Sequence, residues 1–373
     1  MQKITFSKNT TAFFPTLQKA VNEYFKTNNL KPTGNISLYT KTLTLIPAAI
    51  ILYVTLVFFT THPAIAISLA CILGLIKASI GFSVMHDACH GSYSTKKWVN
   101  ETIGLSLNAL GGNAFLWKQK HNEIHHTWTN IDGADEDIAK IPLIRHCPTQ
   151  PHFKIHKYQH LYIFFLYGLS SLLWVAAMDF VKYFSGKIYN TKLKGMNNKE
   201  HFVFWISKVL YIVFYIAIPI YFIGWLPWLI GFSAMHFVMG LTLSIVFQLA
   251  HVVEITHFEQ IETDTLHVES EWAIHQIRTT ANFARNNKII NWYVGGLNYQ
   301  VEHHLFPRIS HVHYPAISKI VEKVCHDFNV PYNDFPTMWS AIKSHYRFMK
   351  KLGEGSTIKP IEKKMEMSLS HAS

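Results

Sequence analysis

Long apolar stretches dominate the pattern of hydrophobic and polar positions along the chain. A helix that spans a bilayer needs about 20 predominantly apolar residues. Four stretches meet this requirement: residues 40–61, 64–84, 205–224 and 228–250. The tight links His62-Pro63 and Trp225 to Pro227 join these stretches in pairs. The pattern predicts an all-α integral membrane protein with four transmembrane helices arranged as two hairpins.

A fifth apolar stretch, residues 161–181, has basic residues on both flanks. Lys and Arg accumulate in the cytoplasmic loops close to membrane spans. Both ends of this stretch are therefore expected on the cytoplasmic side, which predicts an interfacial helix and not a span. The links within the two hairpins contain no Lys or Arg, as expected of the opposite side. Interfacial helices and the polar segments should then form a helical cap on the cytoplasmic face.

The composition agrees with a membrane protein. Hydrophobic residues make up 49% of the chain and charged residues 15%, where a soluble domain carries about 25% charged residues. The net charge is +11, and the basic residues lie between and beside the apolar stretches, as in membrane proteins. A nucleic-acid partner is therefore not expected. The predicted organisation is an N-terminal cytoplasmic segment (1–39), a membrane domain (40–345) and a flexible C-terminal tail (346–373). Lys77 is expected to extend its side chain to the membrane interface.

Histidine is concentrated in three short clusters, all on the predicted cytoplasmic side. The chain has 23 histidines. His86 and His90 form an HxxxH directly after the second apolar stretch, and residues 121–126 form an HxxxHH. Residues 300–304 form a QxxHH. Positions three and four apart share one face of a helix, so each cluster predicts a group of imidazoles that point the same way.

Three clusters on one side of a membrane favour a metal site. One HxxxH by itself is more often a surface or core pair than a metal site. Imidazole binds zinc, copper, iron and nickel, and seven clustered histidines are too many for one ion but suit two. The chain contains no HExxH, which argues against a zinc peptidase. Two imidazole-ligated metals beside a membrane indicate redox chemistry on an apolar substrate, and iron fits oxygen activation.

The three clusters resemble the histidine boxes of the membrane fatty acid desaturases. The string from Asn298 to Pro307, with Gln300 opening the third box, is similar to the front-end branch, which places double bonds between an existing one and the carboxyl end. Asn130 and the Asp135 to Ile138 segment are similar to that branch's N-x-x-x-x-D-P-D-I, with Glu136 in place of the proline. The segment from Trp272 to Phe283 also resembles the branch. The similarity covers roughly residues 40–345.

The resemblance implies a set of iron ligands and acidic neighbours. Gln300 stands where the wider family has histidine, so it could bind iron weakly, bind through water or orient a neighbour. His236 lies too far from the cytoplasmic side, and His257, His267 and His275 match no box and are expected to be solvated. The implied ligands are His86, His90, His121, His125, His126, His251, Gln300, His303 and His304. The acidic residues expected to hold ligand histidines are Asp87, Asp135, Asp137 and Glu302.

The activity implied by the resemblance is oxygen-dependent desaturation of a fatty acyl chain carried by coenzyme A or by a lipid. A pair of irons would supply the oxidant with O2 as co-substrate. Electrons would come from an external ferredoxin or cytochrome b5 with its reductase, and a basic face favours an acidic partner. The expected location is a bacterial cytoplasmic membrane.

Two other functions remain open from the sequence. A hydroxylase or monooxygenase on the same scaffold could act on a lipid, sterol or carotenoid. A metal transporter would need polar or ionisable groups within the bilayer, and the four apolar stretches contain few of these.

Overall fold

The computed structural model describes residues 4–8, 11–138, 141–259 and 266–355. By length and composition, five of the described helices could cross a membrane. Four of them coincide with the predicted spans, and the fifth contains the stretch 161–181. The five helices are Ile36–Phe58, Pro63–His90, Lys154–Ser185, Asn198–Ile223 and Trp225–His251.

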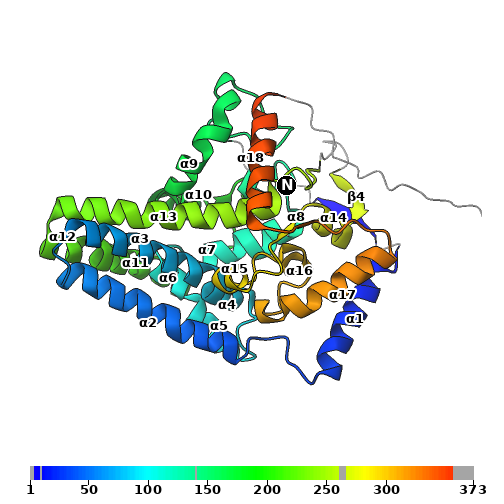
Figure 1. Cartoon of the computed structure of the whole chain (residues 1–373), viewed down its shortest axis with the longest axis horizontal. Coiled ribbons are helices and arrows are strands. Elements are labelled where there is room, and N and C mark those ends of the chain that lie inside the picture. The colour runs from blue at the N-terminus through cyan, green and yellow to red at the C-terminus, as the bar shows by residue number, and fades with distance from the viewer. Residues whose placement is uncertain (1–3, 9–10, 139–140, 260–265, 356–373) are drawn as a thin grey trace, which may run out of the picture.

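The four helices that match the predicted spans run alongside one another (Figure 1). Local signals set their starts: Asn35 accepts from the backbone N–H of Ser37, Pro63 opens the second helix, and Asn197 forms a capping box with Glu200. They comprise α2 (Ile36–Phe58), α3 (Pro63–Ile80), α11 (Asn198–Ile212) with η6 (Val213–Ala217) and α12 (Ile218–Ile223), and α13 (Trp225–His251).

The fifth long helix inclines steeply to the other four (Figure 1). It consists of η4 (Lys154–Tyr158), α9 (Gln159–Leu173), η5 (Trp174–Met178) and α10 (Asp179–Ser185). It crosses α13 where two glycines let the backbones approach: a Cβ on Gly240 would lie 2.7 Å from the carbonyl oxygen of Gly168. Ser171 also donates to the backbone oxygen of His236 at 2.8 Å. This crossing fixes one face of α9 and α10 against the bundle.

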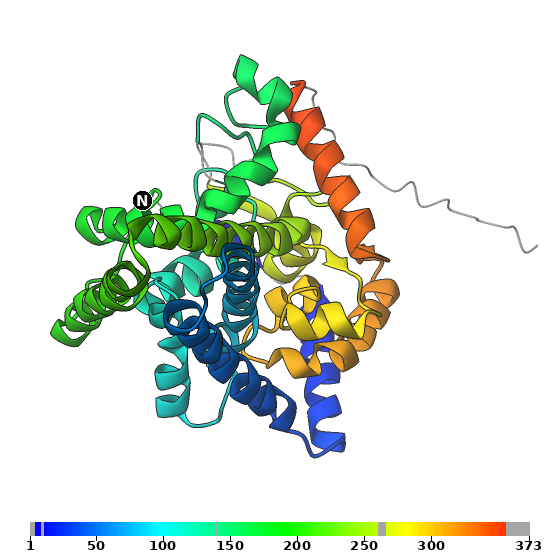
Figure 2. The same cartoon turned by 60° about the vertical axis from the view of Figure 1, so that its left-hand side comes forward.

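The polar segments form a helical cap at one end of the bundle. Helix α1 (Phe13–Thr27) packs there against α17 (Tyr314–Asp327) through Phe13, Leu17 and Val21, so two distant segments share one core, as Figures 1 and 2 show. The other cap helices are α4 (His86–His90), α5 (Lys97–Gly104), α6 (Ser106–Ala109), α7 (Ala114–Lys118), η2 (Gln119–His125), α8 (His126–Trp128), η3 (Glu136–Ile138), α14 (Trp272–Arg278), α15 (Lys288–Tyr293), α16 (Gln300–Leu305), η7 (His311–His313) and α18 (Met338–Gly353).

Among the described residues, three small two-stranded sheets tie the cap together. Strands β1 (Thr5–Ser7) and β4 (His267–Glu271) pair in parallel, as do β5 (Asn282–Phe283) and β6 (Asp334–Phe335). The antiparallel pair β2 (Lys187–Ile188) and β3 (Thr191–Lys192) follows α10. The parallel pairs join segments that are far apart in the chain, which closes the cap.

Two details differ from the sequence-based expectations. The segment predicted as a flexible tail from residue 346 begins inside α18, whose Phe348, Met349 and Leu352 are buried in a core cluster with α9. Residues 356–373 lie outside the described part of the chain. Lys77 does not reach an interface: it is 1% exposed, and its ammonium lies 3.9 Å from the ring centroid of Tyr215. The reason is that α3 presents this position to α13 and α11, not to the bilayer edge.

Candidate metal centre and its cavity

The first histidine cluster lies on a continuation of a long helix. Helix α3 passes through the π-helical turn η1 (Gly81–Met85) into α4, which carries His86 and His90. Their ring centroids lie 4.7 Å apart, as expected for positions four apart on one helical face. Gly91, with a φ of 75°, ends the helix in the left-handed conformation that glycine tolerates. The second apolar stretch therefore delivers both imidazoles to the cap.

The second histidine cluster spans a π-helical segment. His121 and His125 lie in η2, and His126 begins α8. Extra residues in a π turn are frequent at functional sites, and here they bring three imidazoles of one segment to the same side. Trp117 stacks on His121 with ring centroids 4.3 Å apart, which fixes the orientation of that ring.

The third cluster and His251 complete the site from the other side. His303 and His304 are on the short helix α16, whose start is held by the side chain of Asn282 accepting from the backbone N–H of Val301 at 2.9 Å. His251 is the last residue of α13. Side chains from segments more than 200 residues apart thus converge in one buried volume.

The candidate ligand nitrogens of these histidines gather in two groups. Within each group the candidate atoms lie within 4.8 Å of one another, a spacing that allows one ion to contact all of them. His126 lies between the groups, with ring centroids 4.5 Å from His303 and 4.4 Å from His304. One group comprises His86, His90, His121 and His303, and the other comprises His125, His251 and His304.

Several of these imidazoles have one ring nitrogen occupied and the other buried without a protein partner. Nδ1 of His125 lies 3.1 Å from a carboxylate oxygen of Asp135, and Nδ1 of His304 lies 2.8 Å from Oε1 of Gln276. Nδ1 of His303 lies 3.1 Å from the Tyr314 hydroxyl. The corresponding Nε2 atoms of these three histidines are buried and make no hydrogen bond. A bound metal satisfies this pattern, because a ligand histidine usually donates its other N–H to a fixed acceptor.

The site favours neutral imidazole. Burial, together with the neighbouring histidines, holds the pKa values of His121, His126, His303 and His304 well below the ordinary range. His125 differs: burial opposes its charged form, but Asp135 and Asp137 outweigh that effect and raise its pKa. Neutral imidazole is the form that binds a metal, so the donor set fits a divalent cation such as Fe(II).

The four acidic residues expected beside the ligands separate into two kinds. Asp135 contacts His125 directly, and a carboxylate oxygen of Asp137 lies 3.6 Å from the same Nδ1. Asp87 instead accepts from the Ser310 hydroxyl at 2.6 Å and lies 3.1 Å from Nδ1 of His311. Asp87 was expected to hold one of the clustered histidines. It instead connects α4 to the segment after α16.

Glu302 also differs from the expectation. It accepts from the Tyr332 hydroxyl at 2.6 Å and from the Asn282 amide at 2.9 Å, and neither partner is a ligand histidine. Burial raises its pKa to about 7. On the short helix α16, Glu302 faces away from His303 and toward β5 and the segment before β6, so it anchors the helix instead of a ring.

The remaining polar residues of interest have distinct positions. Gln300 is buried and lines the cavity described below, beside His86 and His303. His236 is buried mid-way along α13, where its Nε2 lies 2.7 Å from the Tyr211 hydroxyl, so it is remote from the cap as expected. The expectation of solvation holds for His267, which is exposed.

For two other histidines the expectation of solvation is wrong. His275 is fully buried, with Nε2 2.9 Å from the backbone oxygen of Thr129, and His257 is half-buried. Spacing gave no sign of this, because both are buried by distant segments. The contacts of Tyr314 and of the Thr279 carbonyl, 3.3 Å from Nδ1 of His251, were likewise not foreseen.

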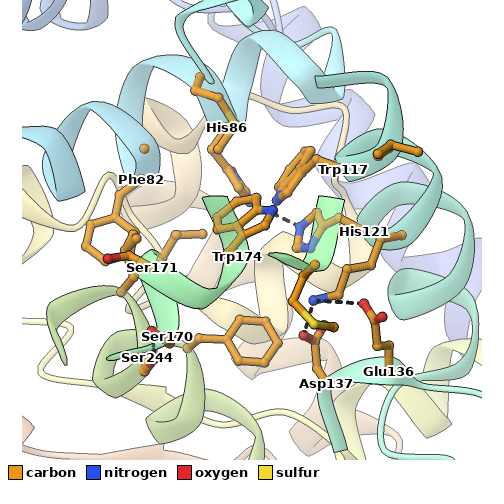
Figure 3. A pocket seen from close by; sticks show the side chains of 18 of the residues that line it. Phe82, His86, Trp117, His121, Glu136, Asp137, Ser170, Ser171, Trp174 and Ser244 are labelled. Atoms are coloured by element: carbon orange, nitrogen blue, oxygen red, sulfur yellow. Dashed lines mark hydrogen bonds and ion pairs between the residues drawn. The ribbon is translucent and has the colours of Figure 1, made fainter. Parts of the chain in front are cut away.

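A cavity of about 330 Å³ adjoins the first ligand group (Figure 3). Figure 3 places His86, Trp117 and His121 between two ends, with Phe82, Ser171 and Ser244 at one and Glu136 and Asp137 at the other. Apolar side chains from η1, α7, η5 and α13 form much of the wall. They include Met85, Leu116, Trp174, Met178, Leu243 and Phe247. An apolar chain lying in this cavity would pass directly beside the ligand histidines.

Comparison with known proteins identifies the family. Residues 39–336 match the family model described as fatty acid desaturase. The chain is 38% identical over 363 residues to the sn-1 linoleoyl-lipid 6-desaturase of Arthrospira platensis, covering 96% of this chain and 97% of that protein. It is 34% identical to the protein of the same description in Synechocystis sp. over 95% of this chain and 99% of that protein.

A third relative extends the comparison beyond these two proteins. The Acyl-lipid (8-3)-desaturase of Physcomitrium patens is 35% identical, over 91% of this chain and 72% of that protein. The family model and the near full-length relatives point to the same family. This chain belongs to the fatty acid desaturase family.

Proposed function

We propose that this enzyme is a front-end acyl-lipid desaturase with two irons held by its clustered histidines. The observation that carries the proposal is the division of the ligand nitrogens into two groups beside an apolar cavity. A pair of irons would supply the oxidant that removes two hydrogens from neighbouring methylenes, with O2 reduced to water. The protein's part is to hold, orient and shield the reacting chain.

The ligand assignment follows from burial and spacing. The first iron is assigned to His86, His90, His121 and His303, and the second to His125, His251 and His304. His126, between the groups, is assigned to either or both. Gln300, which borders the cavity, is assigned a direct, weak bond or one through water. Asp135 and Asp137 support the proposal because they hold the tautomer of His125 that leaves Nε2 free.

The substrate assignment rests on the relatives and on the third box. Two relatives are described as acting on a linoleoyl lipid at position 6, and another as an acyl-lipid desaturase. Position 6 lies near the carboxyl end of the chain, which is what the front-end pattern around Gln300 predicts. We assign a lipid-bound acyl chain in preference to acyl-coenzyme A on this basis.

The proposed topology has four spans, with the site on the cytoplasmic side of a bacterial membrane. The long helix Lys154–Ser185 is assigned to the interface because it inclines steeply to the others and has basic residues at both ends. Its first turns pack against α18, where Gln159 donates to the backbone oxygen of Met349 at 2.8 Å. Its last turn pairs with Glu136 near the site. Both ends therefore lie on the cap side.

Electrons are proposed to come from an external ferredoxin or cytochrome b5 served by its reductase. The net charge of +11 favours an acidic partner on the cytoplasmic face. The pair of irons, the donor and the lipid substrate together define the reaction.

The test is expression of the full chain in a host that supplies linoleoyl lipid, followed by mass spectrometry and double-bond localisation. Desaturation gives a product two mass units lighter, with a new double bond on the carboxyl side of the existing ones. A product sixteen units heavier would indicate a hydroxylase and contradict the proposal. His304→Ala should abolish the product, whereas exposed His326→Ala should retain it.

A further inference from the structure

Four charged side chains lie together at one end of the cavity beside the metal centre. Lys182 is 2.7 Å from a carboxylate oxygen of Glu136. Lys120 forms a short ion pair with Asp137 and lies 3.5 Å from the same oxygen of Glu136. All four side chains line the cavity. The cluster has two positive and two negative charges. A fifth charged residue of the lining, Asp179, is paired with Lys208 at 2.8 Å.

Such a cluster is costly unless it serves a polar ligand. Removing charged groups from water is expensive, and a buried ion pair often stabilises a protein less than apolar side chains would. Lys182 is only 5% exposed. Its ammonium has three N–H donors, and among the described residues Glu136 is the carboxylate within reach. Donors therefore remain that can face a ligand in the cavity.

One helix runs along the cavity, from this cluster to the opposite end. Ser171, Trp174, Met178 and Lys182 follow one another at intervals of three or four residues on the continuous helix α9, η5 and α10, and all line the cavity. At about 1.5 Å per residue, Lys182 and Ser171 lie about 16 Å apart along the helix axis. The cavity thus has a charged end and a far end separated by the length of an acyl segment.

The charged end lies close to the ligand histidines. Lys120 directly precedes His121, and Asp137 lies 3.6 Å from Nδ1 of His125. Five carbon–carbon bonds of about 1.5 Å in zigzag span only about 6 Å. A chain modified near position 6 therefore needs its carbonyl group within a few ångströms of the metal centre, and this is where the charged end is.

We propose that Lys182 donates a hydrogen bond to the carbonyl oxygen of the acyl chain. This contact fixes the number of carbons between the carbonyl group and the new double bond. This positioning role rests on the proposed front-end function and adds the group that recognises the carboxyl end. Glu136 holds the ammonium in place, and the acyl chain continues past His86 and His121 toward Phe82 and Leu243. The carrier is a glycerolipid ester.

Lys182 is the residue to test, because Lys120 is tied to the metal ligands. Replacing Lys120 would disturb Asp137 and through it His125. Lys182→Met removes the donors and keeps most of the side chain's length. Exposed Lys187→Met, five residues later in β2, is the matched control. Lys182→Leu is a second replacement without donors, and like Lys182→Met it leaves Glu136 and Lys120 unchanged.

The experiment uses the full-length, iron-loaded protein in lipid nanodiscs with three probes. They are a phosphatidylcholine with an ester-linked linoleoyl chain at sn-1, its ether-linked analogue, which lacks the carbonyl, and linoleoyl-coenzyme A. The dissociation constant of each probe, the position of the new double bond and the iron content are measured. Wild type and Lys187→Met should bind the ester about tenfold or more tightly than the ether, the usual worth of a hydrogen bond to a charged group.

Lys182→Met and Lys182→Leu should bind ester and ether equally, keep their iron, and give double bonds at scattered positions. An ester preference retained in both variants would overturn the role of Lys182 while leaving the desaturase function intact. Tighter binding of linoleoyl-coenzyme A that is lost in the Lys182 variants, with no preference for the ester lipid over the ether lipid, would overturn the glycerolipid carrier. A wild-type protein that holds iron but modifies none of the probes would overturn the proposed function and this inference with it.

Discussion

Nε2 of His86 lies 3.2 Å from Nε2 of His121, although the two residues are on different helices. Nε2 of His126 lies at the same distance from His121. A neutral imidazole has a lone pair on one nitrogen, and lone pairs that face each other repel unless a proton or a cation lies between them. Burial and the neighbouring histidines hold the pKa values of His121 and His126 well below the ordinary range, which disfavours a second proton on either ring. Nε2 of His121 faces two other imidazole nitrogens at once, and a cation shared by the three nitrogens fits this arrangement.

Asp135→Asn is predicted to weaken the second ligand group. The carboxylate lies 3.1 Å from Nδ1 of His125 and also accepts from the backbone N–H of Asn130 at 3.0 Å. An amide can present its N–H to Nδ1 and so favour the wrong tautomer. Loss of such a partner typically costs about 10- to 100-fold in metal affinity or activity. Iron titration of the variant measures this, with exposed Asp327→Asn as the control. Unchanged affinity in Asp135→Asn would contradict the role assigned to this carboxylate.

Stability and metal retention are predicted to fall as the pH falls below about 6.5. His121, His126, His303 and His304 have folded-state pKa values well below the unfolded value. The unfolded chain therefore takes up protons first as the pH drops through about 6.5, and the folded state loses stability from there downward. Above that pH the histidines are neutral in both states and cost nothing.

Bound metal changes the size of this effect but not its sign, because protons compete with the metal for the same nitrogens. Thermal unfolding and iron content measured in steps from pH 8 to pH 5 test the prediction. Both should be level down to about pH 7 and decline below it. Stability that rises toward pH 5 would show that the imidazoles are charged in the folded protein.

The long apolar helices and the histidine clusters could be predicted from the sequence because each depends on local regularities. Bilayer thickness fixes the length of a span, and the four predicted stretches coincide with four of the long helices. His86 and His90 are four residues apart, and Gln300 and His303 are three apart. Both spacings place side chains on one face of a helix. What the sequence could not give is the angle between helices. The steep course of α9, which provides a wall of the cavity, is set by its crossing with α13.

Gly240→Ala is predicted to disturb that wall. A Cβ at this position would lie 2.7 Å from the carbonyl oxygen of Gly168 and 2.9 Å from that of Tyr167, so α9 must move away. Activity should fall more than about tenfold, because small displacements of a reacting group have large effects on rate. Gly231→Ala on the same helix is the control, since its Cβ would meet its nearest neighbour at 4.0 Å. Equal activity in the two variants would show that the crossing does not position the cavity.

Lys77→Met is predicted to raise the thermal stability of the protein in detergent and to retain activity. Lys77 is buried with Met235 and the ring of Tyr215, and its ammonium has no carboxylate within 4 Å among the described residues. Methionine has a similar length without the cost of burying a charge. Unfolding monitored by tryptophan fluorescence provides the measurement. A lower melting temperature, or loss of activity in a folded variant, would assign Lys77 a role that its contacts do not explain.

The burial of single polar residues could not be predicted from the sequence either. His275 was expected in solvent but lies against Thr129, and Asp87 and Glu302 anchor helices instead of ligand rings. Each of these contacts joins segments that spacing along the chain does not relate. The contact of Asp135 could be predicted because this residue lies only ten positions after His125 in the chain.

The iron content of the purified protein shows whether the clustered histidines hold two metal ions. The two groups of ligand nitrogens predict two irons per chain. A variant confined to one group, His90→Ala or His251→Ala, should retain about one. Protein that is folded but holds no iron, or that holds a single iron lost in both variants, would contradict the account.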